Sequence, residues 1–288
     1  LGAEGELALW RLAVELFESS EEREEKRMAA QGLTELTLTM QRRGELQVGH
    51  ALAVRQAELL AGLPDEELDG DLVWLRVVND TLVAVGDTDA QRPVLTRLLR
   101  LTGDAYEDDE NVWSARMYAE ALLDVAEFYE RVGRTELRHE ALASAVTAME
   151  NLEGYEPDPA WLGTALRLNR EYGNFLEEQG QVADARTVYA HALELLKRLG
   201  AGEDGYGQRF EEARLLSRIG ANSLYAGDTA GARMDLEPAV ERLRELVAGH
   251  PGVTFEVQLV SALDKLGEAY WREGDYRRAE ALLEEGLV

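Results

Sequence analysis

The sequence predicts an all-α fold, in which antiparallel helix pairs stack into a right-handed α-solenoid. Glycine recurs at a fixed interval of 47 positions, at Gly86, Gly133, Gly180, Gly227 and Gly274. The segments on either side of each glycine repeat their apolar residues with the period of an α-helix. Alternating β-branched runs bounded by turn residues, which would indicate strands, do not occur in the sequence.

The helical period is clearest after Gly180. Apolar residues there recur at steps of three, one and three, which places them on one stripe of a helix. These residues are Val182, Ala185, Val188, Tyr189, Ala192, Leu195, Leu196 and Leu199. A glycine at the turn supplies the left-handed conformation that ends the first helix of a pair. Asp228 and Asp275, directly after their glycines, are suited to cap the second helix.

In chain order, we expect a partial repeat over 1–20 and then six helix pairs, which together make one solenoid over 1–288. Gly44 gives a weaker copy of the glycine spacing, 42 positions before Gly86. The chain begins at Leu1 rather than Met and ends inside an apolar-periodic stretch, so we expect a fragment of a longer protein. The approximate repeats are 26–63, 66–104, 111–153, 159–200, 207–249 and 253–288.

The composition excludes several classes of partner. The 288 residues carry 30 Lys and Arg against 56 Asp and Glu, a net charge of −26, which repels nucleic acid phosphates and anionic membrane surfaces. No stretch of about 18 apolar residues predicts a transmembrane helix. Hydrophobic residues make up 45% of the chain, which is enough for a buried core. We therefore expect a cytoplasmic protein that binds neither nucleic acid nor membrane.

The last repeat combines small and large residues in a specific order. It has Leu263, Leu266-Gly267 and Tyr270 on its first helix, then Gly274-Asp275-Tyr276, Ala279 and Leu283. This pattern resembles the tetratricopeptide repeat family. The small residues let paired helices approach closely, and the large ones fill the space between neighbours. Similar sets surround Gly180 and Gly227.

The resemblance weakens toward the N-terminus. Arg138 stands where a small residue is expected, and Asn79 and Gln91 occupy the two small positions of the repeat around Gly86. A period of 47 is longer than the family's usual ~34 and also fits HEAT or armadillo arrays, which are the main structural alternative. The Gly-Asp turns and the spacing of small residues favour tetratricopeptide-like repeats.

The resemblance implies that a protein or peptide segment binds in a concave groove, which the first helix of each pair lines. Helical register predicts which side chains face this groove. The candidate residues are Arg167, Arg170, Asn174, Glu178, Arg214, Ser217, Tyr225, Asp264, Glu268 and Trp271. The same register adds Glu177, Ala221 and Lys265, with Arg218 at the edge.

Arg170 and Asn174 lie four residues apart and project from one helix face. This pair resembles part of the carboxylate clamp with which some tetratricopeptide proteins bind a C-terminal carboxylate, because arginine presents a planar fork of donors and asparagine an amide. Two positions depart from the clamp: Arg218 stands where it has asparagine, and Ser261 where it has a basic residue. The alternative is that these arginines pair with neighbouring carboxylates of the chain itself.

The residues do not predict an enzyme. No nucleophile is paired with a base, and the many carboxylates single out no acid–base dyad. The chain has no cysteine, and its four histidines, which are His50, His139, His191 and His250, are scattered. We therefore expect neither a metal nor a cofactor.

Two functions are compatible with this pattern. The first is a non-catalytic interaction module that binds a partner segment in the groove. The alternative is a regulatory or sensor array within a larger bacterial signalling protein, such as a STAND-type ATPase, a transcription regulator or a protease. The last helix also presents Ala279, Leu282, Leu283 and Leu287 without a polar cap, which predicts self-association through this end.

Overall fold

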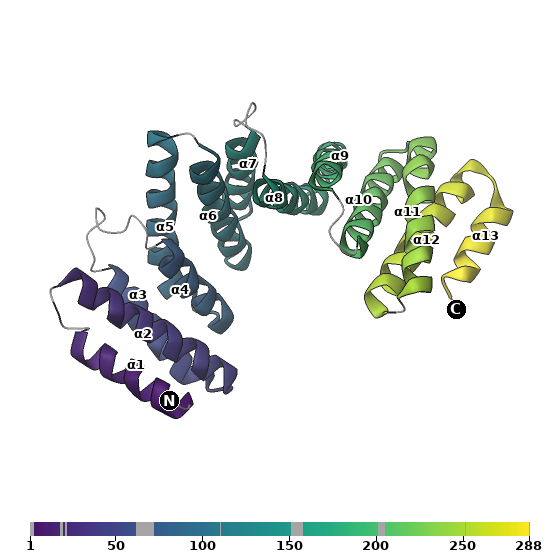
Figure 1. The fold of residues 1–288 in the computed structure, drawn as a ribbon. Helices are drawn as coiled ribbons and strands as arrows, with labels where there is room; N and C mark the ends of the chain where they lie inside the picture. Colours follow the sequence, from purple (N-terminus) through teal and green to yellow (C-terminus); the bar gives the residue numbers. More distant parts are fainter. Residues whose placement is uncertain are drawn as a thin grey trace. The chain divides into compact units, whose positions relative to one another are not determined.

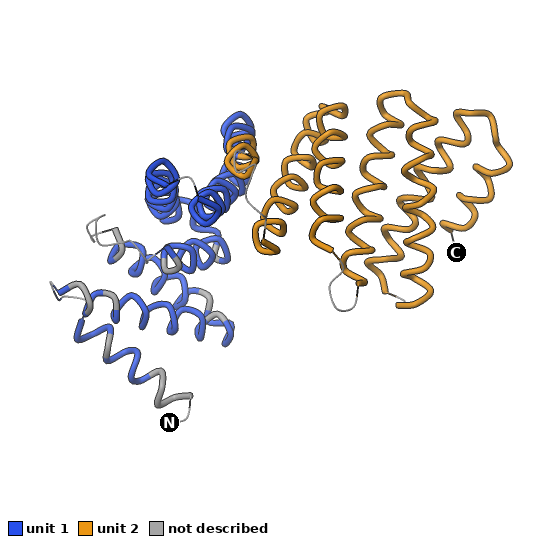
Figure 2. Tube along the Cα trace, turned by 45° about the horizontal axis from the view of Figure 1, so that its top comes forward, with its two compact units in different colours: residues 1–141 blue, residues 142–288 orange. Residues whose placement is uncertain are grey.

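The structure is a computed structural model, and all of the regular structure it describes is α-helix. The predicted fold class, helix pairs of a tetratricopeptide-like solenoid without strands, is confirmed for these residues. The chain divides into two compact units, over 1–141 and 142–288 (Figure 2). The described residues are 3–17, 20, 22–61, 72–109, 111–150, 158–200, 205–250 and 252–287.

Unit 1 begins with a single helix and continues with helices that pack on their neighbours in sequence (Figure 1). Contacts join α1 to α2, α2 to α3, α3 to α4, α4 to α5 and α5 to α6. This order of contacts is typical of a repeat array, in which each element packs mainly on its neighbours. The bounds are α1 Ala3–Phe17, α2 Arg23–Arg42, α3 Leu46–Ala61, α4 Leu72–Val85, α5 Thr88–Asp108 and α6 Val112–Arg131.

Unit 2 contains three complete helix pairs, and α7 runs from the end of unit 1 into its beginning. The pairs α8–α9, α10–α11 and α12–α13 each pack internally, and α9–α10 and α11–α12 contacts join one pair to the next. The bounds are α7 Thr135–Glu150, α8 Pro159–Glu178, α9 Val182–Leu199, α10 Tyr206–Tyr225, α11 Thr229–Gly249, α12 Val253–Glu273 and α13 Tyr276–Glu285.

The five periodic glycines lie at the turns, as predicted. Their φ angles are 69–86°, in the left-handed region that glycine adopts without a steric penalty. The predicted caps also form: the Asp228 carboxylate accepts a hydrogen bond from the Gly231 N–H at 2.9 Å, and Asp275 accepts one from the Arg278 N–H at 3.2 Å. At these two turns a glycine ends one helix and the aspartate after it caps the next.

Two other glycines permit close packing inside unit 2. A Cβ on Gly173 in α8 would lie 2.6 Å from the ring of Tyr189 in α9. A Cβ on Gly220 in α10 would lie 2.6 Å from Cγ of Leu236 in α11. Tyr189 and Leu236 are 47 positions apart and fully buried. Successive pairs thus repeat one packing arrangement, a large side chain of the second helix against a glycine of the first.

Candidate functional site

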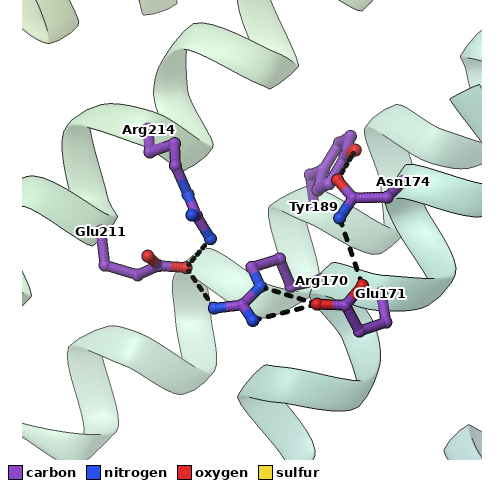
Figure 3. A network of polar contacts seen from close by, with 6 residues as sticks. All are labelled: Arg170, Glu171, Asn174, Tyr189, Glu211 and Arg214. Carbon is purple, nitrogen blue, oxygen red and sulfur yellow. Dashed lines mark hydrogen bonds and ion pairs between the residues drawn. The ribbon is translucent and has the colours of Figure 1, made fainter. Parts of the chain in front are cut away.

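The predicted groove residues lie on α8, α10 and α12, the first helices of the three pairs of unit 2. The structure brings three of them, Arg170, Asn174 and Arg214, into one polar network (Figure 3). Tyr225, Asp264 and Glu268 all lie close to Lys265 of α12, and Trp271 contacts Tyr276, the first residue of α13.

Carboxylates of the chain surround Arg170. Its guanidinium donates to Oε1 of Glu171 at 3.0 and 3.2 Å, and its Nη1 lies 3.5 Å from Oε1 of Glu211 on α10. Arg214 donates to the same Glu211 oxygen at 2.9 Å. Partial burial acts to lower the pKa of Arg170, but the hydrogen bond and charge of Glu171 and the charge of Glu211 outweigh it and raise that pKa. Arg170 is therefore a permanent cation with its fork directed at two side chains of the chain itself.

The network continues through a buried tyrosine. Asn174 Nδ2 lies 3.5 Å from Glu171, and its Oδ1 accepts a hydrogen bond from the Tyr189 hydroxyl at 2.8 Å (Figure 3). The same hydroxyl lies 2.9 Å from Oε2 of Glu177, which also accepts a 3.0 Å hydrogen bond from Arg218. The polar contacts run from α10 to α8, through the Tyr189 hydroxyl of α9, and by way of Glu177 back to α10. Three arginines and three glutamates take part, so their formal charges cancel.

Charged and aromatic side chains also meet on α10 and α12. The Lys265 ammonium lies 5.7 Å from the ring centre of Tyr225, and 3.3 and 3.8 Å from carboxylate oxygens of Asp264 and Glu268. Glu268 accepts a further hydrogen bond from Arg272 at 2.5 Å. A cation this close to a ring face is attracted by its π electrons, so Lys265 connects the two helices electrostatically.

Trp271 is 60% exposed, and its only ring contact in the described structure is with the exposed Tyr276, at 6.5 Å between centroids. Arg167 and Glu178 are exposed on α8. Ser217 donates its hydroxyl hydrogen to the Ala213 carbonyl of its own helix at 2.8 Å. Trp271, Arg167 and Glu178 are therefore exposed to solvent, and the Ser217 hydroxyl is bonded to its own helix.

The contacts of Arg170 agree with the alternative to the carboxylate clamp. Both partners that orient Arg170, Glu171 and Glu211, are missing from the predicted groove residues. Glu211 precedes Arg214 by three positions, a spacing that brings side chains together on a helix, and this signal was present in the sequence. The sequence carries no comparable signal that Arg170 would meet Glu211, which lies on another helix. A ligand carboxylate at Arg170 has to compete with both glutamates.

The described residues include no group of three or more His, Asp or Glu side chains arranged to hold a metal ion. In the same part of the chain, every helix is too short or too polar to cross a lipid bilayer. The polar side chains on the surfaces of α8, α10 and α12 are joined by hydrogen bonds and ion pairs.

The fold and this surface define an α-helical repeat protein with a polar face on the first helices of its pairs. Residues 259–288 match the family model described as tetratricopeptide repeat, and the resemblance predicted from the sequence is confirmed. The match covers the last repeat, where the small and large residues follow the family pattern most closely. No curated protein sequence matches the chain.

Solved structures of low sequence identity share the fold. BtubC (BKLC) from P. vanneervenii is 19% identical with a TM-score of 0.60, and the match covers 83% of this chain and 87% of that one. The C-terminal part of a TPR repeat-containing protein from Cytophaga hutchinsonii is 14% identical with a TM-score of 0.53, covering 96% and 94%. The apo form of RapI is 10% identical with a TM-score of 0.51, covering 98% and 89%.

The buried hydroxyl of Tyr189 predicts sensitivity to alkali. Burial, and secondarily the charge of Glu177, raises the pKa of Tyr189 above its ordinary value of 10.0. Below pH 10 the hydroxyl is protonated in both the folded and the unfolded chain. Above it the unfolded chain ionises first, so Tyr189 favours unfolding by up to about 1.4 kcal/mol per pH unit. Urea unfolding between pH 9 and 11 is expected to show a smaller loss of stability in Tyr189→Phe, and equal losses would contradict this.

Proposed function

We propose that the chain is a non-catalytic interaction module that binds a protein or peptide segment along the first helices of unit 2. The observation that carries this proposal is the location of the polar and aromatic side chains. Arg170, Arg214 and Tyr225 lie at the surface of α8 and α10, and Trp271 is exposed on α12. A row of such groups on successive first helices suits an extended segment, which can contact one repeat after another.

The charges of the network of Figure 3 already cancel, so we expect the partner segment to bind by replacing ion pairs within that network. Glu171 and Glu211 already accept from Arg170, so an acidic group of the partner exchanges with them and a basic group pairs with the released glutamate. Trp271 on α12 offers a large exposed apolar surface. Rigid aromatic and arginine side chains contribute most of the binding energy in many interfaces, and we expect the same of Arg170 and Trp271.

The test compares Arg170→Ala plus Trp271→Ala with a matched control, Arg198→Ala plus Trp113→Ala. The control removes one exposed arginine and one exposed tryptophan that lie on α9 and α6. A partner captured by the wild-type chain is identified, purified and titrated against each variant. We expect its affinity to fall at least about tenfold for the groove variant, since hot-spot truncations exceed 1–2 kcal/mol each, and to remain unchanged for the control.

Equal affinity of the two double variants would contradict binding at these helices. Capture of no partner by the wild-type chain would contradict the module itself and favour the regulatory array within a larger signalling protein. Circular dichroism of both variants shows whether they are folded, so a loss of binding is assigned to the surface only when the helical signal is retained.

We also propose self-association through the last helix pair. Val257 and Val260 on α12, Leu283 on α13 and Leu287 just after α13 are 44–87% exposed. The equivalent residues one repeat earlier are Leu236 and Val240. Both are buried in a core that includes residues of α12. The exposed surface is therefore shaped for a helix pair of the same repeat, which a second copy of the chain supplies.

Leu283→Glu is expected to abolish this association, because a charge in an apolar interface loses its hydration. Sedimentation of the wild-type chain over a hundredfold range of concentration measures the effect, with Leu12→Glu at an exposed leucine of α1 as the control. A wild-type chain that stays monomeric throughout, or a Leu283→Glu variant that associates as the wild type does, would contradict the proposal.

A further inference from the structure

A cavity lies in unit 2, and none of the candidate groove residues lines it. It has a volume of about 430 Å³, and helices α7, α8 and α9 line it. This volume is within the range of pockets that bind small organic molecules. The apolar walls are Ala143, Val146 and Val188, and the polar or aromatic lining residues are Thr147, Glu150, Asn169, Tyr172, Thr187 and His191.

Asn169 interrupts the pattern of the repeat. The positions 47 and 94 residues before and after it are all leucine, namely Leu75, Leu122, Leu216 and Leu263, and all of them are buried. Asn169 is equally buried, with 2% of its surface exposed. Burying an amide where the fold accepts leucine is unfavourable unless its hydrogen bonds are satisfied. Departures of this kind from a repeated local rule are expected at functional sites.

Tyr172 is a second departure beside the same cavity. The equivalent residues in the other repeats are Val78, Val125, Ile219 and Leu266, all smaller and aliphatic. The α8–α9 repeat therefore replaces two aliphatic positions by residues with polar groups, and both replacements line one cavity. This coincidence distinguishes the cavity from a gap left by imperfect packing.

Asn169 determines that Nδ1 of the neighbouring His191 ring carries a hydrogen. Its Nδ2 donates to the Ala165 carbonyl at 2.9 Å, so its Oδ1 faces Nδ1 of His191 at 3.1 Å as an acceptor. Nδ1 of His191 must then carry a hydrogen, so in a ring with a single hydrogen Nε2 is the acceptor. The carboxylate of Glu150 lies 3.6 Å from the same Nδ1. A buried amide thus orients a ring whose remaining nitrogen accepts hydrogen bonds.

The hydroxyl oxygens of Thr147 and Thr187 are also acceptors. Thr147 and Thr187 donate their hydroxyl hydrogens to the Ala143 and Ala183 carbonyls of their own helices, at 2.9 and 3.1 Å. Their oxygens keep free lone pairs. None of the lining residues is lysine or arginine, and Glu150 contributes a negative charge. A ligand that supplies hydrogen-bond donors and positive charge, together with a short apolar part for the valine and alanine walls, suits Glu150 and these acceptors.

We infer that this cavity binds the ammonium group of a short alkylamine. The ammonium supplies three donors, for which the carboxylate of Glu150 and Nε2 of His191 are acceptors, and the alkyl chain lies against Val146 and Val188. A charge-assisted hydrogen bond to a carboxylate is about twice as strong as a neutral one. Asn169 is a positioning residue, because it acts through the orientation of the histidine ring.

The test titrates the chain with n-butylammonium and follows backbone amide resonances by NMR. We expect saturable shifts at Thr187, Val188 and His191, which line the cavity. Butanol and butyrate are the matched probes, since they have the same alkyl part with a neutral and an anionic head. Butyrate is expected to produce no shifts, and butanol to bind at least about tenfold more weakly, because it lacks the ion pair. Equal binding of all three probes would overturn the inference.

Two variants locate the site, and a third variant serves as the control. Asn169→Leu restores the residue of the other repeats, so we expect it to fold and to lose butylammonium binding. Glu150→Gln removes the charge and is expected to weaken binding at least about tenfold. Glu194→Gln removes an exposed carboxylate of α9 outside the cavity and is expected to change nothing. Unchanged affinity in a folded Asn169→Leu variant, or equal losses in the Glu150 and Glu194 variants, would overturn the site.

An end-blocked Gly-Lys-Gly peptide distinguishes two sources of the ammonium group. Binding of this peptide supports a lysine side chain of a protein partner as the natural ligand. Rejection of the peptide, with retention of n-butylammonium, supports a free organic amine. Rejection of both probes overturns the inference. None of these outcomes depends on the groove, because Asn169 and Tyr172 face the cavity whereas Arg170 and Asn174 belong to the network of Figure 3.

Discussion

Gly173→Ala is expected to destabilise unit 2 by about 1–3 kcal/mol, the usual effect of overpacking a core. The three atoms nearest to an added Cβ, at 2.6, 2.8 and 3.0 Å, all belong to the ring of Tyr189. That ring is fully buried, and its hydroxyl is held by Asn174 and Glu177, so it cannot move aside without breaking hydrogen bonds. Urea unfolding followed by circular dichroism measures the effect.

Gly163→Ala in the same helix is the matched control. An added Cβ there meets nothing within 4 Å, and alanine is a better helix former than glycine by roughly 0.5–1 kcal/mol. The two substitutions are chemically identical but should change stability in opposite directions. If both stabilise the chain, the close approach of Tyr189 to α8 is wrong.

A double variant tests whether the ring causes the loss. The repeat before this one carries Ala126 and Leu142 at the equivalent positions, so Gly173→Ala plus Tyr189→Leu reproduces a combination that the sequence already uses. We expect the added Cβ to destabilise the chain less when leucine replaces the ring, because neighbouring substitutions are coupled. Additive losses would assign the effect of the Cβ to the backbone of α8 instead.

Much of the fold followed from the sequence because its determinants are local. The left-handed turn at Gly180 depends on one residue type, and a cap such as Asp228 depends on a neighbour three residues away. The packing of Gly267 and Leu283 follows a pattern that recurs at fixed spacing. A signal of this kind is repeated in each helix pair, so one weak copy does not hide it.

The candidate site was less predictable because long side chains choose among several partners. Helical register assigned Arg170 and Asn174 to one face, and both belong to the same network. It did not predict that Glu211, on another helix, would lie near Arg170. Such a contact depends on the distance between helices and on the rotamers of two flexible chains, neither of which spacing along one helix determines.

Asn169 is the opposite case. The sequence alone shows that this position departs from the repeat, and the structure shows that the departure lies beside a cavity. The 47-residue register alone shows asparagine among leucines. Composition cannot distinguish an exposed asparagine from a buried one, and burial decides whether the exchange is neutral or unfavourable. The cavity and the contact with His191 are what connect the exchange to a ligand.

Leu236→Ala and Leu283→Ala are expected to differ by several-fold in effect, although the two residues occupy the same position of successive repeats. Leu236 is fully buried in a core that includes Leu266 and Tyr270 of α12, and its truncation leaves a cavity that costs about 2–5 kcal/mol. Leu283 is 44% exposed, so less apolar surface returns to water and the loss is roughly 1 kcal/mol. Urea unfolding of both variants at low protein concentration gives the comparison.

The same pair of variants connects stability to self-association. At low concentration the end of the last pair is open to solvent, and Leu283→Ala should be the milder change. If a second copy covers this end at high concentration, association stabilises the folded chain by mass action. The Leu283→Ala variant should then lack that additional stability. Leu236→Ala should instead lower the free energy of unfolding by the same amount at both concentrations. Equal losses for the two leucines at low concentration would contradict the exposed position of Leu283. If Leu283→Ala lowers the free energy of unfolding by the same amount at both concentrations, that result would contradict a second copy bound at this surface.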